Sequence, residues 1–156
     1  MTPAILAARK AGVVHQVLEY THNSAAESYG LEAAELLGLD PACVFKTLVA
    51  DAQGVGLVCA LVPVTGSLDL KALADAVGAR RARMADIAAA ERATGYVVGG
   101  ISPLGQRKLL RTVVDASALL HETVYVSAGR RGVELALAPM DLVHMTKART
   151  AEIARP

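Results

Sequence analysis

Apolar positions along this chain change between helical and strand-like spacing. A cap at Thr2, a proline in the first turn and a stop at Gly12 predict a short N-terminal helix. The segment 68–78, LDLKALADAVG, places its apolar residues on one helical face, and Ser67 precedes it as the expected N-cap. Further helices are expected over 31–38, 86–94 and from 139 through 143.

Strand-like segments stand between these helices. The apolar runs 44–51 and 56–64 flank Gln53-Gly54 and predict a pair of largely buried strands. A loop is expected over 21–28, and a turn over 128–132, AGRRG. Other strands are expected over 15–20, 79–84, 112–116, 123–127, 133–138 and 151–156. This interleaving predicts a mixed α/β fold with a mixed sheet, and the lack of linkers or repeats predicts one domain over 1–156.

The composition fits one self-sufficient core. The chain has 156 residues, of which 53% are hydrophobic and 20% charged, and its formal net charge is +1. A charge this small argues against a polybasic binder of nucleic acid, and DNA is not an expected partner. Aromatic residues make up only 3%, too few for a sheet that stacks a long single strand.

Two further features bear on location. No apolar run approaches the roughly 20 residues that cross a bilayer, and the start, MTPAILAARKAG, has a capped helix in place of a signal peptide. Cys43 and Cys59 lie sixteen positions apart without a CxxC pair, which fits reduced thiols. We therefore expect a cytoplasmic protein with no membrane partner.

The usual signatures of metal and nucleophile chemistry are missing from the sequence. The histidines at 15, 22, 121 and 144 are scattered and show no ligand spacing, so no metal or other cofactor is expected. Either cysteine offers a nucleophile, but the apolar surroundings of both favour structural thiols. No GxSxG, Walker A or GxGxxG string occurs.

Two segments carry residues that simple packing does not explain. Lys46 interrupts the apolar run 44–49, VFKTLV, where it needs either a path to water or an anionic partner. The segment 99–105, GGISPLG, offers a backbone that can approach a ligand closely. A solvated edge position for the lysine and an ordinary tight loop for the glycines are the alternatives.

Three separated motifs together resemble the YbaK family of aminoacyl-tRNA deacylases. They are VFKTL over 44–48, GYVVGGISPLGQ over 95–106, and VYVS over 124–127 followed by GRRG over 129–132. The likeness runs from Thr2-Pro3 to 153–155, nearly the whole chain. It implies the fold of the editing domain of prolyl-tRNA synthetase, with a curved, partly closed mixed sheet flanked by helices.

The resemblance also implies roles for single residues. Lys46 matches the lysine on which activity depends, with a positional and electrostatic role rather than a covalent one. A deacylase must also stabilise the oxyanion, and we expect backbone N–H groups around Gly99 to Ile101 to supply those contacts. Glu134 stands where the family usually has aspartate, and the loop 22–29 differs from the family pattern. The implied substrate-binding residues are Tyr20, Tyr29, Thr47, Gly99, Gly100, Ile101, Ser102, Pro103, Ser127 and Glu134.

The implied reaction is trans-editing, with Cys-tRNA(Pro) as the expected substrate and the substrate thiol assisting ester cleavage. Alternatives are another mischarged tRNA, such as Ala-tRNA(Pro), or a non-catalytic module that binds an aminoacyl or nucleotide end. Local basic clusters at 80–83, 107–111 and 130–131 are candidates for contact with the acceptor end of the tRNA, each otherwise a solvated face. Because the net charge is small, prolyl-tRNA synthetase is the expected partner that presents the tRNA.

Overall fold

The computed structural model describes residues 1–22 and 29–156. Its helices are α1 (Pro3–Ala11), α2 (Tyr29–Leu37), α3 (Leu70–Val77), α4 (Ile87–Thr94) and α5 (Pro139–Thr146), with short 3-10 turns η1 (Pro41–Cys43) and η2 (Ala116–Leu120). Its strands are β1 (His15–Glu19), β2 (Phe45–Ala52), β3 (Gly56–Pro63), β4 (Ser67–Leu68), β5 (Ala82–Met84), β6 (Arg111–Asp115), β7 (Val124–Arg130), β8 (Val133–Leu137), β9 (Arg149–Ala151) and β10 (Ala154–Arg155). The predicted loop 21–28 lies largely outside the described residues.

The larger sheet has five strands in the order β5-β2-β3-β6-β9. The β2–β3 hairpin is antiparallel, whereas β6 runs parallel to both β3 and β9. The predicted mixed sheet is therefore confirmed. A second, antiparallel sheet has the order β1-β8-β7, and β10 pairs with β4.

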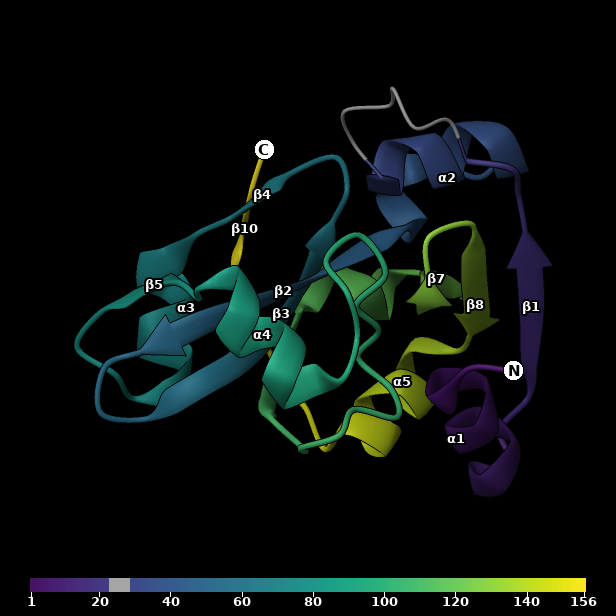
Figure 1. Ribbon diagram of the computed structural model, residues 1–156. Helices are drawn as coiled ribbons and strands as arrows, with labels where there is room; N and C mark the ends of the chain where they lie inside the picture. The colour runs from purple at the N-terminus through teal and green to yellow at the C-terminus, as the bar shows by residue number, and fades with distance from the viewer. Residues whose placement is uncertain (23–28) are drawn as a thin grey trace.

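The two larger sheets lie side by side, with β2 next to β7 (Figure 1). An isolated bridge between Val44 and Tyr125 joins them. The family likeness predicts one partly closed sheet. This part of the prediction is wrong, because the described strands form separate sheets. The turn η1 ends at Cys43, directly before the bridging residue Val44, and the chain then continues into β2.

The five-stranded sheet carries apolar side chains on both faces. One face packs on α3, where Val58, Val62 and Leu73 are fully buried. The other face joins a core that reaches α1, α5 and the three-stranded sheet. This shared core places β2 of the five-stranded sheet beside β7 of the three-stranded sheet.

The predicted cap of α3 and the predicted turn over 128–132 are both wrong in their boundaries. Asp69, not Ser67, caps α3, because its Oδ1 accepts a hydrogen bond from the N–H of Ala72 at 3.0 Å. Ser67 instead belongs to β4, which pairs with β10. The predicted turn over 128–132 is shorter than expected, because β7 continues to Arg130 through a register shift after Ser127.

The described residues contain no helix that is both long and apolar enough to span a membrane.

Candidate active site

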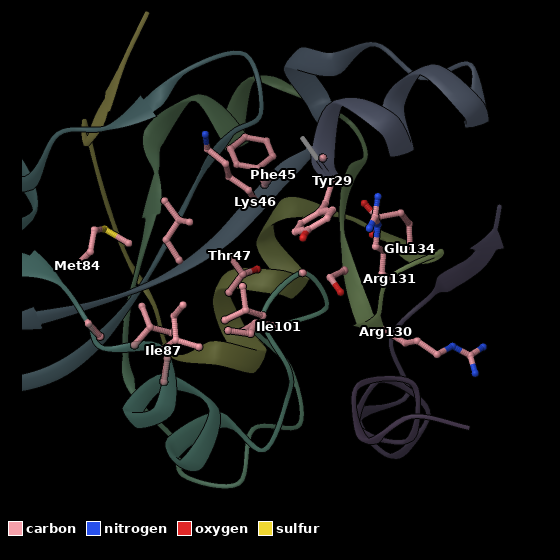
Figure 2. Close-up of a pocket in the computed structure, with 18 of the residues that line it drawn as sticks. Tyr29, Phe45, Lys46, Thr47, Met84, Ile87, Ile101, Arg130, Arg131 and Glu134 are labelled. Atoms are coloured by element: carbon pink, nitrogen blue, oxygen red, sulfur yellow. The ribbon is translucent and has the colours of Figure 1, made fainter. Parts of the chain in front are cut away.

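One pocket of about 480 Å³ lies between the two larger sheets and is flanked by α2 and α4. Figure 2 shows it as an elongated hollow, with Met84 and Ile87 toward one end and Arg131 and Glu134 toward the other. Its lining residues are Tyr20, Tyr29, Gly30, Phe45, Lys46, Thr47, Leu48, Val49, Met84, Ala85, Ile87, Ala90, Val98, Gly99, Ile101, Ser127, Arg130, Arg131 and Glu134.

The pocket forms where strand pairing stops along β2. On this side β5 pairs only with Ala50–Ala52, and the bridge to β7 engages Val44. Within the described residues the stretch 46–48 therefore has no strand partner on that edge. Successive side chains of a strand alternate, and Figure 2 shows Lys46 and Thr47 extending to opposite sides of β2.

Lys46 lies at the rim of the pocket and is half-buried. Among the described residues it forms no ion pair. Partial burial lowers the pKa of its ammonium group from the usual value. A half-desolvated cation without an anionic neighbour favours an anionic ligand, since pairing would recover the lost solvation.

Thr47 contributes an unsatisfied hydroxyl. Its Oγ1 atom is buried and has no hydrogen-bond partner among the described residues. Buried polar atoms are nearly always hydrogen-bonded in folded proteins. The Thr47 hydroxyl is an exception to this rule. It lies in the pocket wall, where a hydrogen bond to a ligand would satisfy it.

Glu134 is the buried carboxyl of the pocket. It lies on β8, in register with Ser127 of β7, and is only 6% exposed. Burial raises the pKa of its side chain to about 8. Burial, together with the nearby Glu134, also raises the pKa of Tyr20. At neutral pH Glu134 is therefore mostly protonated, and a cationic ligand beside it would favour its ionised form.

Arg131 joins α2 to the β7–β8 turn at the same end of the pocket. Its Nη2 is 3.2 Å from Oε1 of Glu32, and both side chains are largely buried. Its guanidinium also lies over the Tyr29 ring, at 4.1 Å from the ring centroid. Tyr29 in turn lies against Gly99, where an added Cβ would be 3.0 Å from the ring edge.

Hydrogen bonds hold the segment 95–106 in place, some within the segment and one to Glu91 of α4. Oε2 of Glu91 accepts from the N–H of Val98 at 2.8 Å, and Tyr96 donates its hydroxyl to the carbonyl of Leu104 at 2.6 Å. The Gly100 N–H already donates to the Val97 carbonyl at 2.9 Å. The backbone N–H groups of residues 99 and 101 donate to no described residue.

The structure gathers most of the predicted site residues around the pocket but leaves three behind its wall. Gly100, Ser102 and Pro103 are buried and do not line the pocket. A Cβ at Gly100 would lie 2.9 Å from the Arg130 Cα atom, so this glycine permits contact between the loop and β7. The Ser102 hydroxyl accepts from the N–H of Leu104 at 3.2 Å and serves the loop itself.

Neither cysteine lines the pocket. Cys59 is fully buried, which raises the pKa of its thiol to about 12. The pKa of Cys43 is also raised by burial, although its Sγ atom is 3.3 Å from Nδ1 of His121. In the part of the chain that the structure describes, no three His, Cys, Asp or Glu side chains gather as a metal site would require.

Several lining residues were not predicted from the sequence. Met84 and Ile87 stand in segments without a motif, and Arg131, although part of the GRRG motif and of a basic cluster, was not predicted as a pocket residue. Of the three clusters, 80–83 and 107–111 have exposed basic side chains. In the third, Arg130 is exposed but Arg131 is committed to Glu32.

Comparisons with known proteins agree with this geometry. A crystal structure of the hypothetical protein APE2540 superposes with a TM-score of 0.87 at 25% identity, covering 99% of this chain and 100% of that one. A crystal structure described as a trans-editing enzyme for prolyl-tRNA synthetase gives 0.81 at 24% identity, covering 100% and 99%. Both matches show that this chain has the same fold as those two proteins.

Sequence comparison gives the family. The model of the aminoacyl-tRNA editing domain matches residues 24–145. EbsC of Enterococcus faecalis, which carries the name Cys-tRNA(Pro)/Cys-tRNA(Cys) deacylase, is 39% identical over 120 residues, or 77% of this chain and 73% of EbsC. The chain belongs to the aminoacyl-tRNA editing domain family and is an aminoacyl-tRNA deacylase, as its motifs predicted.

Proposed function

We propose that this protein hydrolyses Cys-tRNA(Pro) in trans, with residues 1–156 acting as one editing domain. The identity with EbsC supports the substrate. The observation that carries the site assignment is the buried carboxyl of Glu134, which has no ion-pair partner among the described residues yet faces a pocket. An aminoacyl ester supplies the missing partner, because its α-ammonium group is a cation of the right size.

The substrate would then lie along the pocket. The α-ammonium binds at Glu134, and the ester carbonyl lies near the N–H groups of residues 99 and 101. Lys46 at the rim binds the phosphate that precedes the terminal adenosine, and Thr47 hydrogen-bonds the sugar. The apolar end at Met84 and Ile87 receives the adenine base. Such positioning, combined with stabilisation of the oxyanion, accelerates a labile ester without a catalytic triad.

The nucleophile in this proposal belongs to the substrate. The cysteinyl sulfur attacks its own ester carbonyl, the 3′ oxygen of the tRNA leaves and takes up a proton, and water later opens the resulting thiolactone. Neither Cys43 nor Cys59 lines the pocket, so neither enters this step.

A complex with prolyl-tRNA synthetase in the cytoplasm completes the proposal. A formal net charge of +1 gives the free protein little attraction for a polyanion. The synthetase would present the mischarged acceptor end, and the exposed basic clusters at 80–83 and 107–111 would contact its backbone.

Single-turnover deacylation tests the substrate. Cys-tRNA(Pro), Ala-tRNA(Pro) and Ser-tRNA are incubated with excess protein, with and without prolyl-tRNA synthetase. We expect the fastest hydrolysis for Cys-tRNA(Pro), and no acceleration of Ser-tRNA by the synthetase. Faster hydrolysis of Ala-tRNA(Pro) would replace the proposed amino acid and exclude the substrate thiol as the nucleophile, while deacylation itself would stand.

A further inference from the structure

The charged end of the pocket contains an arrangement that the deacylation proposal does not use. Glu32 and Tyr29 belong to α2, whereas Arg131 belongs to the β7–β8 turn. One guanidinium contacts both partners, at 3.2 Å from the carboxylate and 4.1 Å from the ring centroid. The contact therefore ties the first turn of α2 to the hairpin that carries Glu134.

The arrangement is buried enough to be rigid. The side chains of Glu32 and Arg131 are 5% and 18% exposed. A buried charge that loses its partner is strongly unfavourable, so neither side chain leaves the pair readily. Tyr29 is different, because it is 41% exposed and would otherwise rotate freely.

Two contacts hold the Tyr29 ring on the pocket wall. The guanidinium lies over its face, and the Gly99 backbone lies close enough that an added Cβ would be 3.0 Å from Cε2. Gly99 has a φ of 97°, which places its backbone against the ring in a conformation that favours glycine. The ring thus forms a fixed boundary beside Glu134.

We propose that Arg131, held by Glu32, is a positioning residue that fixes Tyr29 as the wall selecting for small amino-acid side chains. The inference rests on the proposed function, since it needs an aminoacyl group at Glu134. A fixed aromatic wall excludes a larger side chain by overlap, whereas a mobile one would yield to it. Exclusion by size is the discrimination that a pocket of this kind provides, because apolar contacts separate small side chains only weakly.

The test measures kcat and KM for tRNA(Pro) charged in turn with cysteine and with penicillamine, which keeps the thiol at the same position but carries two more methyl groups. Arg131→Met keeps much of the side-chain volume but removes the charge, and Tyr29→Ala removes the wall. We expect each to lower the preference for cysteine over penicillamine by about tenfold or more, chiefly by improving hydrolysis of the penicillaminyl ester. The double variant should add little, since both changes act through one wall.

Matched variants separate this role from general stability. Tyr29→Phe keeps the ring and should keep the discrimination. Arg131→Lys keeps a cation and should retain part of the discrimination that Arg131→Met loses. If Arg131→Met fails to fold, the variants Glu32→Gln, Tyr29→Ala and Tyr29→Phe test the proposal in its place. The Tyr29 variants should fold, because the exposed Tyr29 contributes less to the core.

Two results would overturn the proposal. One is an unchanged cysteine-to-penicillamine ratio in folded Arg131→Met and Tyr29→Ala; the other is an equal loss for both esters. Failure of the proposed function looks different: Lys46→Ala would then remain active, or wild-type protein would prefer another amino acid. In the second case the same ratio is measured against that preferred amino acid.

Discussion

The two ends of the pocket differ in how their side chains are held. At the charged end Tyr29 and Arg131 each touch another residue of the site, and Glu134 is buried in the sheet. At the apolar end Met84 and Ile87 are 46% and 63% exposed. Contacts within the protein therefore fix the geometry of the charged end, as our proposed size selection requires. The apolar end offers surface that any flat, weakly polar group can cover.

The largest effect should come from Lys46, which stands between the two ends. Replacement with alanine should slow deacylation roughly a hundredfold to a thousandfold, because a positioning contact worth about 3 to 4 kcal/mol in the transition state is lost. The thermal midpoint should stay unchanged or rise, since a partly desolvated charge is removed.

Lys46→Arg should recover little activity, because a planar guanidinium does not fit the place of a compact ammonium. Single-turnover rates and thermal melts measure both variants. A near-parental rate in Lys46→Ala would refute the catalytic assignment, and unfolding would show a structural role.

Glu134→Gln should reduce kcat/KM about tenfold to a hundredfold, because a neutral amide loses the charge-assisted contact with the ammonium group. The stability of Glu134→Gln should also lack the pH dependence that Glu134 gives to the parent protein. The pKa of Glu134 is raised to about 8 by burial, so its contribution to stability is complete below the unfolded value near 4.5 and is lost as the pH rises through 8.

Urea denaturation at pH 5, 7 and 9 measures this second effect. The parent should lose on the order of a few kcal/mol relative to Glu134→Gln between the lowest and highest pH. Parallel pH profiles for the two proteins would mean that Glu134 is ionised in the folded state at all three values.

Gly99→Ala should disturb the charged end more mildly, lowering activity about tenfold. Gly54→Ala is the matched control, because both glycines have positive φ, at 97° and 82°, but only Gly99 has a ring within 4 Å of its added Cβ. Each should lose about 1–2 kcal/mol of stability from the backbone conformation. Equal activity in the two variants would show that Tyr29 does not need its contact with Gly99.

The smallest effect is expected at the apolar end. Combined Met84→Ala and Ile87→Ala should raise KM for the aminoacyl-tRNA about three- to tenfold, since partial apolar contact contributes about 1 kcal/mol. Hydrolysis of cysteine methyl ester, which has no base, should be unaffected. An equal loss with both substrates would place the amino acid, not the base, at this end.

Sequence motifs predicted the parts of this site that are continuous in the chain. Lys46 and Thr47 fall in one strand motif, and Gly99 and Ile101 in one loop motif. The pair of Glu32 and Arg131 spans 99 positions, and no local pattern predicts which arginine of a basic turn will meet a helix carboxylate. The cap of α3 shows the same limit, because pairing of β4 with β10, not local propensity, decides between Ser67 and Asp69.

The open edge of β2 has a consequence beyond the pocket. An exposed strand edge can pair with the strand of another molecule, and natural proteins often protect such edges with lysine. Lys46 stands within the stretch 46–48 that lacks a strand partner on this side among the described residues. The lysine that we propose as a substrate contact would therefore also protect this edge from self-association, and Lys46→Ala should aggregate more readily in concentrated solution.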